Sequence, residues 1–212
     1  MIIGPPANLS CTYRYATLPM ISPENVAEHS WYVSYYSLCI GSYLVERGYN
    51  DIDMIKLLSL SILHDLPEAY TGDFINRVKH SKHADLSHEL NSLEKRIVER
   101  ESVSMELPKN VTDSLTESVT HGKETNHVMI FKVCDTLALM TKMVRETMLG
   151  NRYAEAELKN MCSIFSHRGH EMSQQQELVG DLGLILNDAV FVVRDLLEKK
   201  EVTSAMLGRD AV

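Results

Sequence analysis

The sequence predicts an all-α fold. Apolar residues recur at steps of three and four over most of the chain, turn residues separate long segments, and strict apolar–polar alternation is absent. A chain of 212 residues can bury a substantial core within the size of one ordinary domain. We therefore expect a single helical domain over 1–212, with a core at about 10–150 and a helical extension over 151–212.

The N-terminal segment should be irregular, because residues 1–21 hold three of the six prolines. The first long helix should begin at Ser22, since a hydroxyl, a proline at the first helical position and an acid in the first turn are start signals. It should run to about Arg47 and end at Gly48.

A second helix should start near Asp51 or Asp53 and reach His64 and Asp65. Pro67 lacks a backbone donor, so it should kink or end this helix. Five further helices are expected, at 84–102, after Pro108, and at about 124–149, 152–166 and 174–200.

The composition excludes several kinds of partner. A net charge of −8 argues against binding a nucleic-acid polymer, because such surfaces need clustered Lys and Arg. The four cysteines lie far apart without C-x-x-C pairs, which fits reduced thiols in a cytoplasm. The chain has no apolar run of about 18 residues that would span a bilayer. We expect a cytoplasmic protein that binds no membrane.

The stretch SLSILHDLPEAYTGD places His64 and Asp65 side by side at the end of an apolar helix. One imidazole and one carboxylate are metal ligands, but a divalent ion needs about four to six donors. His29 and Asp135 each lie within a largely apolar helix, where an unpartnered ionisable group would be costly. These four residues on three helices predict a metal site.

Each residue also has a simpler interpretation when it is taken alone. An isolated helical histidine is more often a satisfied core or boundary residue. Asp135 alone would more often form a salt bridge, and Lys132 lies one turn earlier to supply it. Glu68 suits an exposed acid at a helix end, and Asp73 suits a turn residue after Gly72. The combination of residues, rather than any single one, favours the site.

The motifs together resemble the HD-domain metal-dependent phosphohydrolases, most closely the bacterial and phage 5′-deoxynucleotidases. They are RY at 14–15, ENVAEHS at 24–30, ILHDLPEAYTGD at 62–73 and Asp135 in KVCDTL, and they cover the first two-thirds of the chain in the family's order. The resemblance implies an HD-domain helical bundle that uses a divalent metal ion to hydrolyse 2′-deoxynucleotides.

The resemblance also implies roles for individual residues. The metal ligands of the family are matched by His29, His64, Asp65 and Asp135. Glu68 corresponds to the catalytic acid, and Asp73 to a second carboxylate near the attacking water. Arg14 corresponds to the residue that holds the phosphate, and Tyr15 stands where relatives carry a tryptophan against the sugar. Phosphate-ester hydrolysis needs an activated water, charge neutralisation and proton transfer, and this set offers all three.

The favoured activity is release of phosphate from deoxynucleoside 5′-monophosphates. The alternative is a deoxynucleoside triphosphohydrolase that uses the same site and releases triphosphate, with Arg77, Lys79 and Lys132 as additional cations for the substrate. A non-catalytic nucleotide-binding HD protein is less favoured, because no matching ligand is replaced. Two histidines and two aspartates suit Co, Mn, Zn, Fe or Mg to differing degrees.

The expected partners are a small deoxynucleotide substrate and further copies of the same chain. Trp31 lies two residues after His29 and therefore on another helix face, where core packing or a subunit contact is the better interpretation. We expect a homodimer or a higher homo-oligomer.

Overall fold

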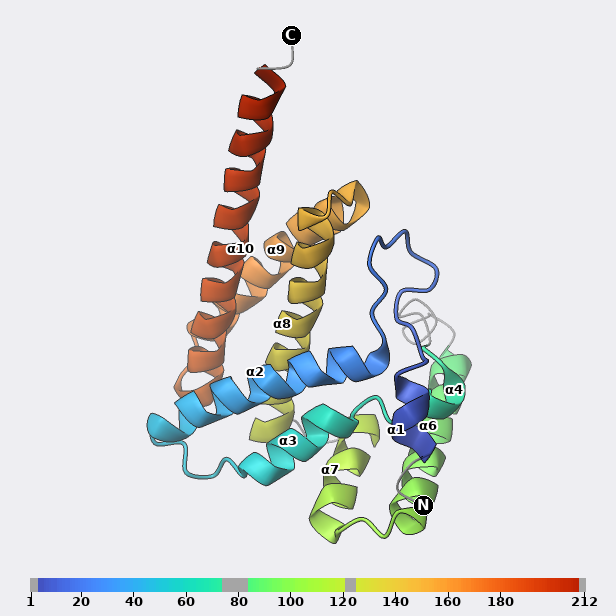
Figure 1. Ribbon diagram of the computed structural model, residues 1–212. Helices are drawn as coiled ribbons and strands as arrows, with labels where there is room; N and C mark the ends of the chain where they lie inside the picture. The colour runs from blue at the N-terminus through green and yellow to red at the C-terminus, as the bar shows by residue number, and fades with distance from the viewer. Residues whose placement is uncertain (1–3, 74–83, 121–124, 210–212) are drawn as a thin grey trace. The chain divides into compact units, whose positions relative to one another are not determined.

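The structure is a computed structural model that describes residues 4–73, 84–120 and 125–209 (Figure 1). Its helices are α1 (Gly4–Leu9), α2 (Val26–Glu46), α3 (Met54–Leu63), α4 (Glu68–Thr71), α6 (Ala84–Ser104), α7 (Lys109–Thr120), α8 (Asn126–Met148), α9 (Arg152–Ser173) and α10 (Glu177–Arg209). Within these ranges there is no strand, although an isolated antiparallel bridge joins Tyr13 and Asn25. The all-α prediction is confirmed.

The chain divides into two compact units, Met1–Leu139 and Met140–Val212. The boundary lies inside α8, earlier than the expected start of the extension at residue 151. The single domain over 1–212 stays a prediction.

The first unit contains a small hydrophobic core that holds the N-terminal segment against the helices. Leu9 of α1, Val26 of α2, Leu66 after α3 and Val98 of α6 are buried together. Helix α2 packs along α3, which also contacts α7, and α1 contacts α4 (Figure 1). Burial of these side chains ties the N-terminal segment to the turn that follows the His64–Asp65 pair.

The expected irregular leader contains a short helix, α1. The first turn of a helix tolerates proline, because its N–H groups have no intrahelical acceptor, so Pro5 and Pro6 fit this start. The burial of Leu9 then gives the segment a hydrophobic anchor. The expectation of an irregular chain over 1–21 was therefore wrong for residues 4–9.

Helix α2 begins at Val26 with Asn25 as its N-cap, three residues later than the cap predicted at Ser22. Asn25 accepts a hydrogen bond from the Glu28 amide at 2.9 Å, and the Glu28 side chain accepts one from the Asn25 amide at 3.1 Å. This capping box satisfies two amides at once. Glu24 instead lies before the helix, where its carbonyl accepts from the Arg14 amide at 2.9 Å.

Helix α3 begins where Asp53 caps it by accepting from the amides of Ile55 and Lys56. It ends at Leu63, with His64 as its C-cap, so it stops short of the predicted end at His64 and Asp65. Glu68 then opens the separate helix α4. The His64–Asp65 pair consequently lies in the turn between two helices.

In the second unit, α9 and α10 contact each other along their lengths. Both exceed their predicted ends, 166 and 200. Gly169 lies inside α9. Because glycine has no Cβ atom, α10 can approach closely at this point; an added Cβ would lie 2.5 Å from Asn187 Oδ1. A buried ion pair joins Lys142 and Glu146 at 2.9 Å.

In the part of the chain that the structure describes, none of the helices is long and apolar enough to span a bilayer.

Candidate metal centre and phosphate site

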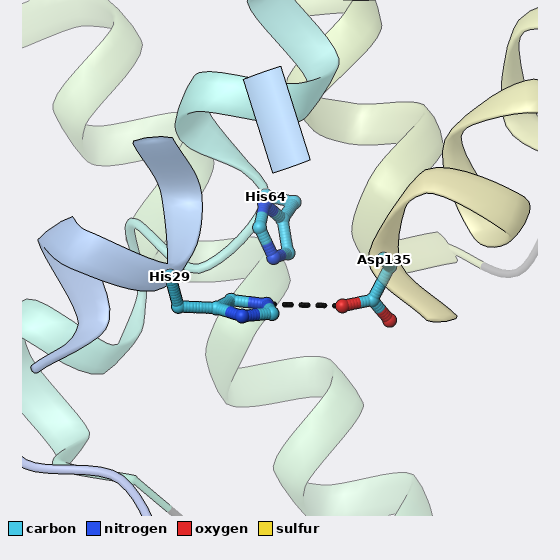
Figure 2. Close-up of side chains that lie close together, drawn as sticks. All are labelled: His29, His64 and Asp135. Atoms are coloured by element: carbon cyan, nitrogen blue, oxygen red, sulfur yellow. Dashed lines mark hydrogen bonds and ion pairs between the residues drawn. The ribbon is translucent and has the colours of Figure 1, made fainter. Parts of the chain in front are cut away.

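Three predicted ligands meet in the first unit. His29 comes from α2, His64 from the end of α3 and Asp135 from α8, and one ligand atom of each lies within 4.8 Å of the others (Figure 2). His29 Nε2 and Asp135 Oδ1 share a hydrogen bond of 3.0 Å. Two imidazole nitrogens and a carboxylate oxygen at this spacing form a candidate site for a divalent metal ion.

The local fold sets the direction of each imidazole. His29 lies one turn after the capping box that starts α2, and its side chain is 1% exposed. His64 Nδ1 lies 2.9 Å from the Ser61 carbonyl oxygen, an acceptor, so this nitrogen carries the proton. Phe131 packs against the His64 ring at 4.9 Å between centroids. His64 Nε2 is therefore the ring nitrogen that faces the site, 3.1 Å from Asp65 Oδ2.

Burial and charge shift the pKa values of these groups in different directions. Burial lowers the pKa of His29, which favours its neutral form. Burial acts to raise the pKa of Asp135, but the hydrogen bond with His29 and the positive charges around it outweigh burial and lower that pKa. Burial acts to lower the pKa of His64, but the negative charges of Asp65 and Asp135 outweigh burial and raise that pKa. The aspartates are thus ionised and available as donors.

Asp65, the fourth predicted ligand, lies beside the three rather than among them. Its Oδ2 atom is 3.1 Å from His64 Nε2 and accepts a hydrogen bond from Arg14 Nη1 at 3.0 Å. Its pKa is lowered, because the charges of His64 and Arg14 outweigh the effect of burial. The structure therefore joins Asp65 both to the imidazole cluster and to Arg14.

Arg14 lies close to two carboxylates. Besides Asp65, the Glu24 carboxylate is 3.9 Å from Arg14 Nε and 2% exposed. Burial acts to lower the pKa of Arg14, but surrounding groups raise it above its ordinary value; they are Tyr15, Asp65, Asp135 and Glu68. The guanidinium is consequently a fixed positive charge next to the imidazole cluster.

Tyr15 and Asp73 meet although they are 58 positions apart. The Asp73 Oδ2 atom accepts a hydrogen bond from the Tyr15 amide at 3.1 Å. The Tyr15 ring lies 5.5 Å from the Arg14 guanidinium, within cation–π range, and burial raises the pKa of Tyr15 to about 12. The predicted pair at 14–15 therefore contacts Asp65, which follows α3, and Asp73, which follows α4.

Glu68, expected alone to be an exposed acid, is buried at 4% exposure as the first residue of α4. Lys132 lies on the exposed part of α8, one turn before Asp135. The carboxylate of Asp135 is bonded to His29. Arg77 and Lys79 lie outside the described residues.

Sequence reasoning missed Glu24, which was interpreted as an acid in the first turn of a helix. Its burial next to Arg14 follows from the antiparallel backbone bridge between Tyr13 and Asn25, a contact that local sequence patterns do not predict. The sequence signal for Glu24 was its position in ENVAEHS, one residue before the N-cap Asn25. His127 is buried, and its Nε2 accepts a hydrogen bond from the Asp53 amide at 2.9 Å.

Known proteins share this sequence pattern. The family model of 5′-deoxynucleotidases described as YfbR-like matches residues 7–174. A 5′-deoxynucleotidase of Erwinia tasmaniensis is 24% identical over 174 residues, which cover 81% of this chain and 86% of the relative. The 5′-deoxynucleotidase YfbR of Escherichia coli K12 is 22% identical over the same shares of the two chains.

Solved structures share the fold. An HD-domain phosphohydrolase of Listeria innocua superposes with a TM-score of 0.63 at 20% identity, covering 95% of this chain and 96% of its own. The HD phosphohydrolase DatZ of cyanophage S-2L, described as bound to dA and one catalytic Zn²⁺ ion, superposes with a TM-score of 0.59 at 15% identity. That match covers 92% of this chain and 98% of DatZ. The HD-domain helical fold is therefore confirmed.

Proposed function

Because the chain belongs to the family of YfbR-like 5′-deoxynucleotidases, we propose that it hydrolyses deoxynucleoside 5′-monophosphates to deoxynucleosides and phosphate at the metal centre of the first unit. The observation that carries this proposal is the convergence of His29, His64 and Asp135 within 4.8 Å, beside the buried guanidinium of Arg14. A cation site next to a fixed positive charge suits a phosphate ester.

The donor set fits a divalent ion. His29, His64 and Asp135 would hold it, and Asp65 would supply the fourth donor after exchanging its contact with Arg14 or sharing it. When bound, the ion would supply an activated water and offset negative charge on the phosphoryl oxygens. Among Co, Mn, Zn, Fe and Mg, the single catalytic Zn²⁺ described for DatZ supports zinc.

The remaining groups act on the substrate. Arg14 has five N–H donors in a planar fork, so a phosphate can be bound while one donor stays on Asp65. Glu68, buried at the start of α4 and close enough to influence the pKa of Arg14, is the group that we assign to proton transfer. Lys132 is proposed as a second phosphate contact from α8.

The sugar is proposed to lie against Tyr15, which covers one side of Arg14. An aromatic ring packed against C2′ leaves no room for a ribose hydroxyl, so deoxynucleotides should be preferred. The deoxyadenosine described in DatZ supports a deoxynucleoside at this fold's site. The triphosphohydrolase alternative is not favoured, since the matching family and the bacterial relatives are 5′-deoxynucleotidases.

We further propose that the enzyme is a homo-oligomer in the cytoplasm. Helix α2 has no Asp, Glu, Lys or Arg between Glu28 and Glu46, and it exposes Trp31, Tyr35 and Leu38 by 50–62%. A second copy is the proposed occupant, because a neutral face of aromatic and hydroxyl groups can pair with itself. All four cysteines are free thiols, which supports a reducing compartment. Sedimentation of wild type and Trp31→Glu tests the assembly.

The test of activity is a panel of deoxy- and ribonucleoside mono-, di- and triphosphates, assayed with each of the five metals. The expected result is metal-dependent release of inorganic phosphate from deoxynucleoside monophosphates, which is lost on chelation and regained on adding metal. Release of intact triphosphate from deoxynucleoside triphosphates, with no action on monophosphates, would establish the alternative instead.

A further inference from the structure

We propose that Asp73 is a positioning residue: it fixes Tyr15 beside Arg14 through the Tyr15 amide and thereby sets the selectivity for deoxynucleotides. This assigns to Asp73 a role other than that of a carboxylate near the attacking water, which the family resemblance implies. The inference deepens the proposed function and rests on it, but the contact itself is testable without any substrate.

The backbone of Tyr15 needs external support. Its φ angle is +60°, in the left-handed region that disfavours residues with a Cβ atom. The conformation opens a turn, in which the Leu18 amide donates to the Tyr15 carbonyl at 2.9 Å. A non-glycine residue stays in this region only where its surroundings hold it there.

Asp73 supplies part of that support. Gly72, with φ of +74°, ends α4 and donates from its amide to the Glu68 carbonyl at 3.0 Å. The chain then presents the Asp73 carboxylate to the Tyr15 amide, and the N···Oδ2 distance is 3.1 Å. A hydrogen bond to a charged acceptor is stronger than one between neutral groups. The bond therefore fastens the turn after α4 to the turn that begins at Tyr15.

The bond also determines where the Tyr15 ring lies. Arg14 is held on its other side by Asp65 Oδ2 at 3.0 Å, and its amide donates to the Glu24 carbonyl at 2.9 Å. With both the Arg14 side chain and the Tyr15 amide fixed, the ring is kept 5.5 Å from the guanidinium. A ring held in one place can exclude a 2′-hydroxyl, whereas a ring free to move cannot.

Two substitutions separate positioning from proton transfer. Asp73→Asn keeps a carbonyl oxygen that can accept from the Tyr15 amide, but it cannot act as a general acid or base. Asp73→Ala removes both abilities. The measurements are hydrogen–deuterium exchange of the Tyr15 amide, which needs no activity, and kcat/KM for a matched deoxy- and ribonucleoside monophosphate. Thermal unfolding and metal content verify that each variant is folded and loaded.

We expect Asp73→Ala to speed exchange of the Tyr15 amide by about tenfold or more and to lower the deoxy-to-ribo ratio of kcat/KM, chiefly through gained action on the ribonucleotide. Asp73→Asn should stay near wild type in exchange and in the ratio, with kcat lowered by less than about tenfold.

Unchanged exchange in Asp73→Ala would overturn the inference, whether or not the protein hydrolyses nucleotides. Loss of about a hundredfold or more of kcat in metal-loaded Asp73→Asn would overturn it as well, because general acid–base catalysis loses rate on that scale. Failure of the proposed function has a different signature: the wild type would hydrolyse neither monophosphate, while the exchange result would still decide whether Asp73 holds Tyr15.

Discussion

His64 and Arg14 illustrate how individual contacts orient the groups of the site. The Ser61 carbonyl fixes the proton on His64 Nδ1, which directs Nε2 toward the neighbouring ligands. Asp65 is 3.1 Å from that Nε2 and 3.0 Å from Arg14 Nη1. One carboxylate therefore links the residues proposed for metal binding to the residue proposed for phosphate binding.

Glu68→Gln should separate proton transfer from metal binding. The substitution keeps the shape of a buried side chain and removes its acid–base function. We expect metal content close to wild type and turnover lowered by about 10²-fold or more. The matched control is Glu99→Gln, which alters a 59%-exposed acid on α6. Equal turnover in Glu68→Gln and Glu99→Gln would mean that another group transfers the proton.

Tyr15→Ala and Arg14→Ala should differ in which substrates they affect. Removing the Tyr15 ring should raise kcat/KM for a ribonucleoside monophosphate relative to its deoxy counterpart, because space opens at C2′. Removing the Arg14 guanidinium should weaken both substrates alike through the phosphate that they share. An unchanged deoxy-to-ribo ratio in Tyr15→Ala would show that another residue recognises the sugar.

The sequence predicted the residues of the candidate site but few of their contacts. Residue type and order were sufficient for His29, His64 and Asp135, which the structure brings together. The Arg14–Asp65 bond spans 51 positions, and the Tyr15–Asp73 bond spans 58. Contacts at such separations depend on how the N-terminal segment lies over the first unit, which local patterns do not encode.

Helix α2 shows how competing local signals decide where an element begins. Ser22, Pro23 and Glu24 form one start signal, while Asn25 and Glu28 form another, and the structure uses the second. The capping box satisfies two amides, and the residues before it remain available for the extended pairing with 12–14. The predicted end at about Arg47 lies one residue from the observed end at Glu46, and Gly48, which was expected to stop the helix, takes φ of +99°.

Asn25→Ala should destabilise the protein by about 1 kcal/mol in the free energy of unfolding, the usual cost of losing an N-cap side chain. Ser22→Ala should cost less, because Ser22 does not cap α2 in the structure. Urea unfolding of the two variants measures the difference. A larger loss in Ser22→Ala than in Asn25→Ala would support the start predicted from the sequence.

The end of α8 is stabilised by buried polar contacts. Lys142 and Glu146 are at most 1% exposed and pair at 2.9 Å, and Asn151 donates to the second oxygen of Glu146 at 2.8 Å while it caps α9. Glu146→Ala leaves a buried ammonium group without this carboxylate, so we expect a loss of about 3–5 kcal/mol in the free energy of unfolding.

The control for Glu146→Ala is Asp113→Ala, which breaks another pair at the same i,i+4 spacing. That pair, with Lys109, is exposed by 90% and 54%, so its loss should change stability by less than about 1 kcal/mol. Similar losses in the two variants would contradict the importance assigned to burial.

At the scale of the whole molecule, the residues proposed for catalysis belong to the unit Met1–Leu139. Helical periodicity predicted the all-α fold, because long amphipathic segments bury one face each. It did not predict the ends of α9 and α10: α9 continues past 166 through Gly169, which packs closely against Asn187 of α10. Element types thus follow from local pattern, whereas their ends depend on packing partners.

The central claim is that His29, His64, Asp65 and Asp135 hold a divalent metal ion required for hydrolysis. The most direct measurement is the metal content, together with phosphate release from deoxynucleoside monophosphates, of untagged wild type, His64→Ala, Asp65→Ala and His88→Ala, the last altering an exposed histidine of α6. We predict stoichiometric metal and activity in wild type and His88→Ala, and loss of both in His64→Ala and Asp65→Ala with helical content retained. Wild-type metal content and turnover in both His64→Ala and Asp65→Ala would contradict the account.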